Sequence, residues 1–111
     1  MLEPIFGSKT IEKILFYVLK NDQTYGSQLS KIFQGSLSSF QKGLDRLETG
    51  AILVSFQIGK TVIYQFNPRY PFLAELKLFL EKAYRFLPQE FKDRCYEQKL
   101  RKRPCRKGKP L

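Results

Sequence analysis

The sequence contains no histidine and only two cysteines in 111 residues. It therefore lacks every Ser-His or Cys-His nucleophile pair and every imidazole ligand for a metal. Cys95 and Cys105 both lie late in the chain, outside its apolar region. We expect no disulfide scaffold, a reducing cytoplasm as the compartment, and surface cysteines without a binding role. A redox switch, or zinc shared across a dimer, is the alternative for the two thiols.

Long apolar runs and catalytic motifs are also missing. The apolar run of residues 14–19 is too short to span a membrane, and the acidic residues Glu3 and Glu12 precede it, unlike the basic start of a signal peptide. There are no paired carboxylates, no nucleophile constellation and no Gly-rich phosphate loop. The sequence predicts a soluble, cytoplasmic protein that is not an enzyme and uses no metal or cofactor.

Positive charge is abundant and unevenly placed. The chain has 20 Lys and Arg against 10 Asp and Glu, a net charge of +10. Residues 92–111 carry +7 of this and residues 1–91 only +3. Such an excess indicates an anionic partner, usually nucleic acid. With 42% hydrophobic residues, a core is expected over residues 1–87, followed by a basic, flexible tail over residues 88–111.

The apolar spacing predicts three helices before any strand. A first helix, with apolar residues at the i, i+3, i+4 spacing, begins after the N-cap residue Ser8 and ends before residues 21–23. A second covers residues 25–33. After a tight turn at Gly35, Ser36 caps a third helix over residues 37–49, which ends with Gly50 in the C′ position.

The apolar period then changes to two. Residues 52–58 and 62–66 alternate around a Gly59-Lys60 turn, as in a β-hairpin, and a last helix covers residues 71–87. The order of elements is α-α-α-β-β-α. The fold class is therefore mainly α with a β-hairpin wing, a winged helix-turn-helix.

The helix over residues 37–49 is the predicted recognition helix, which in this fold enters the DNA major groove. The residues expected to contact bases are Ser38, Ser39, Gln41 and Lys42. The residues expected to contact phosphates are Arg46, Lys60 at the wing tip, and Lys99, Arg101, Lys102 and Arg103 in the tail. The alternatives are an ordinary exposed helix face, an ordinary hairpin turn and a solvated tail.

The last helix carries an apolar stripe too wide for one small domain to cover. Together with the exposed edge of the first helix, it predicts a homodimer interface. Its expected residues are Ile11, Leu15, Phe72, Leu76, Phe79, Leu80 and Ala83. Packing within one chain is the alternative.

Four stretches of the chain resemble winged-helix regulators of the ArsR-like group, most closely small bacterial and archaeal members encoded near nucleotidyltransferases. They are residues 6–9, 41–48, 52–55, and the Tyr-Gln-Phe-Asn-Pro strand end at 64–68 leading into residues 71–72. The resemblance covers about residues 2–87. It implies a winged-helix fold, DNA binding through the third helix and wing, and dimerisation through the terminal helices.

The chain departs from this group at four points. Gly35 replaces a Leu before the recognition-helix cap, and Gly50-Ala51 replaces the usual Ala-Gly after that helix. The wing lacks the usual Arg residues, and the Cys/His metal-sensing motif is missing. The resemblance therefore gives no case for metal regulation.

The sequence thus predicts a dimeric, sequence-specific regulator that binds double-stranded DNA and acts as a repressor. One alternative is a winged-helix protein-interaction module, for instance a partner of a nucleotidyltransferase-like protein, which the sparse charge of the wing favours. The other is an RNA-binding protein, for which the basic tail is the only argument.

Overall fold

The computed structural model describes residues 1–97. It contains six α-helices, a π-helical segment η1 and three strands within those residues. In chain order they are α1 (Glu3–Phe6), α2 (Lys9–Asn21), β1 (Gln23–Thr24), α3 (Gly26–Phe33), α4 (Leu37–Thr49), β2 (Leu53–Ile58), β3 (Thr61–Phe66), α5 (Leu73–Tyr84), α6 (Gln89–Phe91) and η1 (Lys92–Tyr96). The predicted α-α-α-β-β-α order is confirmed, with short additions at both ends and before α3.

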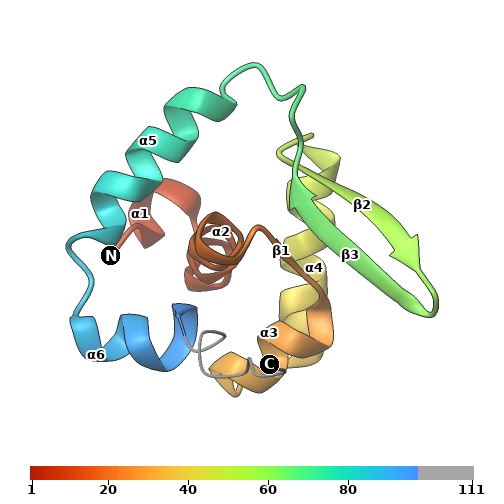
Figure 1. The fold of residues 1–111 in the computed structure, drawn as a ribbon, viewed down its shortest axis with the longest axis horizontal. Coiled ribbons are helices and arrows are strands. Elements are labelled where there is room, and N and C mark those ends of the chain that lie inside the picture. Colours follow the sequence, from red (N-terminus) through yellow and green to blue (C-terminus); the bar gives the residue numbers. More distant parts are fainter. Residues whose placement is uncertain (98–111) are drawn as a thin grey trace, which may run out of the picture.

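Helix α2 lies at the centre of the molecule, with α5 on one side and α4 with the hairpin on the other (Figure 1). Because α2 is covered on several sides, its burial is wider than one stripe. Phe16 and Tyr17 are buried along with Ile14 and Leu15, which lie on the apolar stripe of this helix. The core is therefore built around α2, and the other helices contribute one face each.

The predicted helix starts are confirmed by hydrogen bonds. The Ser8 hydroxyl oxygen accepts from the backbone N–H groups of Thr10 (3.0 Å) and Ile11 (3.4 Å). The Ser36 hydroxyl oxygen accepts from the N–H of Ser39 at 3.3 Å. Each hydroxyl satisfies donors that the first turn of a helix leaves without a partner.

The end of α4 differs from the prediction by one residue. Gly50 has φ −80°, and Ala51, at φ +65°, occupies the left-handed C′ position expected for Gly50. The N–H of Ile52 donates to the Leu47 carbonyl and the N–H of Ala51 to that of Glu48. This is a Schellman motif with alanine where glycine is favoured.

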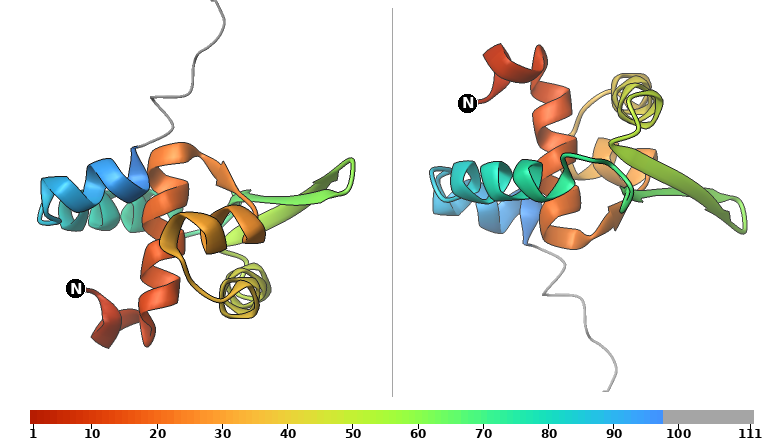
Figure 2. Two further views of the ribbon diagram at one scale, coloured as in Figure 1. Left: turned by 90° about the horizontal axis from the view of Figure 1, so that it is seen from below. Right: turned by 90° about the horizontal axis from the view of Figure 1, so that it is seen from above.

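Strands β2 and β3 form the predicted hairpin, paired from Leu53 with Phe66 to Ile58 with Thr61. Gly59 opens its turn with φ +61°, a conformation that glycine adopts without strain. The sheet has a third strand that the sequence did not predict, because β1 pairs with β3 through Gln23–Gln65 and Thr24–Tyr64. Figure 2 shows the hairpin projecting from the helical body in both views.

The folded region extends beyond Leu87, where the sequence analysis placed the start of the tail. Helix α6 and η1 return to α2, and Tyr96 is 1% exposed in the core. The Asn21 side-chain amide donates to the Tyr96 carbonyl at 2.8 Å. Cys95 is also buried, so the expectation of a surface thiol is wrong for this residue. The aromatic side chains after Pro88 fill the space beside α2, which a periodicity argument could not show.

The expected phosphate contacts at Lys99, Arg101, Lys102 and Arg103 lie outside the described residues, as does Cys105. Within residues 1–97, no helix is both long and apolar enough to cross a membrane.

Candidate nucleic-acid interface

Helix α4 is anchored by one face and exposed along the other. Phe40, Leu44 and Leu47 are buried, and Gly43 lies against α2. Four of the predicted contact residues are exposed on the opposite side, namely Ser38, Ser39, Lys42 and Arg46. The structure therefore brings together on one helix the side chains that the sequence predicted for DNA contact.

Lys42 and Arg46 are directed toward the start of α2. With Ser39 and the Ser8–Thr10 segment they line a shallow hollow of about 250 Å³ between α4 and α2. Two cations beside the N-terminus of a helix are suited to an oxyanion such as a backbone phosphate. Arg46, the predicted phosphate contact, lines this hollow, and Lys42, a predicted base contact, lies beside it.

A hydrogen-bond network that the sequence analysis missed joins α4 to the hairpin. The Gln41 side-chain nitrogen donates to the Tyr64 hydroxyl at 2.9 Å and to Asp45 Oδ1 at 3.1 Å. The Tyr64 hydroxyl also donates to Asp45 Oδ1 at 3.4 Å. One turn later, the Ser55 hydroxyl donates to Glu48. The wing is thus held to α4 at two levels.

In this network the side chain of Gln41 has a different role from the predicted base contact. Its amide is engaged by Tyr64 and Asp45, and a Cβ added at Gly26 would lie 2.7 Å from Gln41 Oε1. The side chain is therefore wedged between α3, α4 and β3 and only partly exposed. In this structure Gln41 joins α4 to the wing, where the sequence predicted a base contact. Only the tertiary position of Tyr64, 23 residues away, reveals this role.

The exposed side of α4 carries as many acidic as basic side chains, so it is not strongly basic. Lys42 and Arg46 are accompanied by Asp45 and Glu48, and both acids accept hydrogen bonds from the wing. Burial raises the pKa of the Tyr64 hydroxyl, so this residue is a neutral donor and acceptor at physiological pH. The acids thus position the wing, and the two cations are the charged groups directed away from it.

The wing itself is unusually apolar. Lys60 is exposed at its tip, as predicted, but Ile58, Val62 and Phe56 are exposed beside it, at 57%, 40% and 38%. An apolar tip is better suited to a groove wall or a protein surface than to a row of phosphates.

The predicted dimer-interface residues separate into two groups. Ile11, Leu15 and Leu80 are buried in the core of the single chain, because α5 packs on α2 there. Phe72 and Phe79 are exposed, at 62% and 40%, while Leu76 and Ala83 are partly buried beside the core. Ile5 and Phe86 are not among the expected interface residues, although Phe86 lies on the predicted apolar stripe of the last helix; they are 65% and 71% exposed.

Phe72 is the N-cap residue of α5, Phe79 lies within the helix, and Phe86 lies in the turn that follows its end. Phe79 also contacts Phe6, with ring centroids 6.3 Å apart, which continues the surface onto α1. We call this the Phe72–Phe79–Phe86 face.

No group of three or more Cys, Asp or Glu residues that could hold a metal ion occurs within residues 1–97.

Comparison with known proteins finds the fold but no sequence family. No family model matches the chain, and no curated protein matches it. Three solved structures share the arrangement, and two of them are described as a repressor and a transcriptional regulator. The adhesin competence repressor AdcR of Streptococcus pyogenes is 13% identical with a TM-score of 0.55, covering 85% of this chain and 72% of its own.

The transcriptional regulator BldR of Sulfolobus solfataricus is 14% identical with a TM-score of 0.57, covering 89% of this chain and 72% of its own. A double mutant of ZitR of Lactococcus lactis in its apo form is 12% identical with a TM-score of 0.53, covering 90% of this chain and 78% of its own. At these identities the likeness establishes the winged-helix fold.

Proposed function

We propose that this chain is a DNA-binding transcriptional repressor that inserts α4 into the major groove. The observation that carries the proposal is that α4 exposes its N-terminal half while hydrogen bonds hold it against a projecting hairpin. Ser38, Ser39 and Lys42 are the proposed base contacts, and Arg46 and Lys60 the proposed phosphate contacts. The neighbours AdcR and BldR, described as a repressor and a transcriptional regulator, support this assignment.

The basic residues of the tail are proposed to add affinity without sequence preference. Residues 98–111 contain seven Lys and Arg and no acidic residue. Such a segment releases counterions from DNA and steepens the salt dependence of binding. The ArsR-like group, a cytoplasmic location and the absence of catalytic activity belong to the same proposal, because the sequence resemblance and the lack of catalytic motifs support them.

The experiment is fluorescence anisotropy of the full chain across a salt series, on duplex from the gene's own promoter and on a scrambled duplex. Lys42→Ala is expected to weaken promoter binding, with a free-energy loss of about 1–3 kcal/mol, and to reduce the preference over scrambled DNA. Lys82→Ala removes the same charge from an exposed position on α5 and is the matched control. Equal effects of the two substitutions, or no preference between duplexes, would contradict sequence recognition by α4.

We propose further that the Phe72–Phe79–Phe86 face is a homodimer interface. Three exposed aromatic rings occur along α5 and at its two ends, and exposed apolar groups of this kind mark interaction sites. A dimer would present two α4 helices to half-sites about one helical turn apart.

The oligomeric state, measured by sedimentation equilibrium, tests this proposal. Phe86→Ser is expected to shift a dimer toward monomer, because this ring is 71% exposed and its loss leaves the core intact. Ile58→Ser, at an equally apolar and exposed position on the wing, is the control and is expected to leave the dimer unchanged. A wild-type monomer, or dissociation only with Ile58→Ser, would refute this interface.

A second candidate is a module that binds a partner protein through the wing. The exposed Phe56, Ile58 and Val62 favour it, since the wing of a phosphate-binding protein is expected to be more basic. The anisotropy experiment separates the two functions. Ile58→Ser with unaltered DNA affinity but loss of a co-purifying protein would favour the partner-binding module.

A further inference from the structure

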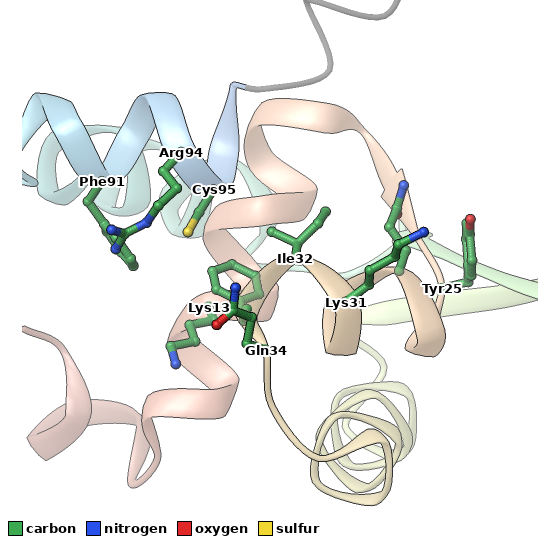
Figure 3. Close-up of a pocket in the computed structure, with 10 residues that line it drawn as sticks. Lys13, Tyr25, Lys31, Ile32, Gln34, Phe91, Arg94 and Cys95 are labelled. Atoms are coloured by element: carbon green, nitrogen blue, oxygen red, sulfur yellow. The ribbon is translucent and has the colours of Figure 1, made fainter.

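A hollow unrelated to the DNA-facing surface lies between α2, α3 and the C-terminal segment. Its volume is about 840 Å³, within the range of small-molecule sites. Arg94 of η1 borders it from one side, and Lys13 of α2 and Gln34 at the end of α3 from the other (Figure 3). It is thus formed partly by residues that follow Leu87, and it exists because those residues fold back onto α2.

The chemistry of this hollow is that of a site for an organic anion. Three cations line it, Lys13, Lys31 and Arg94, and none of its lining residues in the described chain is acidic. Two of the cations lie beside aromatic rings. Lys13 Nζ is 5.4 Å from the ring centroid of Phe33, and Arg94 Cζ is 5.5 Å from that of Phe91. Cations attract an anionic group, and Tyr25 and Ile32 add aromatic and apolar surface to the lining, which suits an apolar body.

The hollow is also connected to the recognition helix. Gln34, which lines it, has φ +55° and forms the turn between α3 and α4. Phe33, which also lines it, stacks on Phe40 of α4 with ring centroids 5.8 Å apart and planes 24° apart. A molecule in the hollow therefore contacts the turn and the ring that set the position of α4.

We propose that this hollow binds a small planar organic anion, an aromatic ring carrying a phosphate or carboxylate, and that the bound anion changes the affinity of α4 for DNA. The regulatory part rests on the proposed function. Binding of the anion and binding of DNA affect each other by the same factor, because both act on the position of α4.

The test is a titration of the full ¹⁵N-labelled chain with phenyl phosphate, followed by backbone amide shifts. Inorganic phosphate and phenol are titrated in parallel, so that the contributions of charge and ring are separated. The expected result is saturable shifts at Lys31, Gln34 and Arg94 with a Kd of about 1 mM or tighter. Phosphate is expected to bind more weakly and phenol not to saturate.

Two charge reversals locate the site. Lys31→Glu, at an exposed lining position, is expected to weaken phenyl phosphate binding by about tenfold or more. Lys82→Glu makes the same change at an exposed position on α5 and is expected to leave binding unaltered. No saturable shift, shifts confined to α4 or α5, or equal effects of the two variants would overturn the site.

The regulatory role is measured separately, by DNA anisotropy with and without saturating phenyl phosphate. A change in DNA affinity that Lys31→Glu abolishes supports it. Shifts at the hollow with no DNA binding at all would refute the proposed function and the regulatory role, while the anion site stands. DNA binding that saturating phenyl phosphate does not alter would refute the regulatory role alone.

Discussion

The side-chain amide of Gln41 on α4 donates to the hydroxyl of Tyr64 on β3 at 2.9 Å. Tyr64 is 4% exposed, and the same hydroxyl lies 3.4 Å from Asp45 Oδ1. Since Tyr64 also pairs with Thr24 of β1, this one residue connects α4, the wing and β1. This phenol group therefore joins the wing to α4, together with the hydrogen bond from Ser55 to Glu48.

Tyr64→Phe removes this hydroxyl and keeps the ring. We expect the free energy of unfolding to fall by about 1 kcal/mol, the usual contribution of a buried hydrogen bond, as measured by urea denaturation. Tyr70→Phe is the control, because the Tyr70 hydroxyl has no hydrogen-bond partner among residues 1–97. If both substitutions cost the same, the Gln41–Tyr64 hydrogen bond does not stabilise the fold.

Ala51 occupies the left-handed C′ position of α4 at φ +65°. The preceding residue, Gly50, has φ −80°, a conformation that any residue adopts. Ala51→Gly is expected to raise the free energy of unfolding by about 1 kcal/mol, since the Cβ is strained in this conformation. Gly50→Ala is expected to add to this, because a Cβ there meets nothing closer than 3.6 Å. Thermal unfolding of the double variant Gly50→Ala, Ala51→Gly measures the combined gain in stability. A Tm below that of the wild type would show that the backbone of Ala51 is not strained.

Gly43 allows α4 to approach α2 closely. A Cβ at this position would lie 2.7 Å from Ile14 Cδ1 and 3.3 Å from Thr10 Cγ2. Gly43→Ala is therefore expected to destabilise the protein by about 1–3 kcal/mol through overpacking. Ile14→Val removes the methyl group in the way, so the double variant is expected to be more stable than the sum of the two losses predicts.

A double-mutant cycle by urea denaturation measures this coupling, with Ile14→Val plus Gly50→Ala as the control pair. The control pair is expected to be additive, because Gly50 has no contact with Ile14 in the space around its Cβ. Additivity in the Gly43 pair as well would show that α2 and α4 separate easily and are not tightly packed there.

The fold could be predicted because its main signals are local. Ser8 and Ser36 mark the helix starts by their own side chains, and the change of apolar period at residue 52 marks the hairpin. The strand β1 could not be predicted, since two polar residues have no periodicity and their pairing is decided by β3, some forty residues later.

The site was predicted less completely, for a related reason. Exposure of Ser38 and Lys42 follows from the helix period, but the direction of Gln41 depends on Tyr64 and Gly26, which lie on other elements. The apolar stripe of α5 likewise could not be divided by sequence alone. Leu80 is fully buried and Phe79 is 40% exposed, and only the position of α2 distinguishes the two neighbours.

Tyr96 makes the stability of the protein sensitive to alkaline pH. Burial raises the pKa of its phenol, with the charges of neighbouring groups as a smaller cause. In the unfolded chain this group ionises near pH 10, whereas the folded chain retains the proton. The associated stability is therefore fully present below about pH 10 and is lost as the pH rises beyond it, at about 1.4 kcal/mol per pH unit for each such tyrosine.

Tyr96→Phe removes this ionisable hydroxyl. Above pH 10, the free energy of unfolding is therefore expected to fall less steeply with pH than in the wild type, by about 1.4 kcal/mol per pH unit. Urea denaturation at several pH values between about 9 and 11 measures the slope. Tyr70→Phe, which removes a hydroxyl from a partly exposed tyrosine, is the control. Since Tyr96 lies nine residues beyond Leu87, an unchanged slope in Tyr96→Phe would indicate that the C-terminal segment is not packed on α2 in solution, and the hollow bordered by Arg94 would then lose one wall.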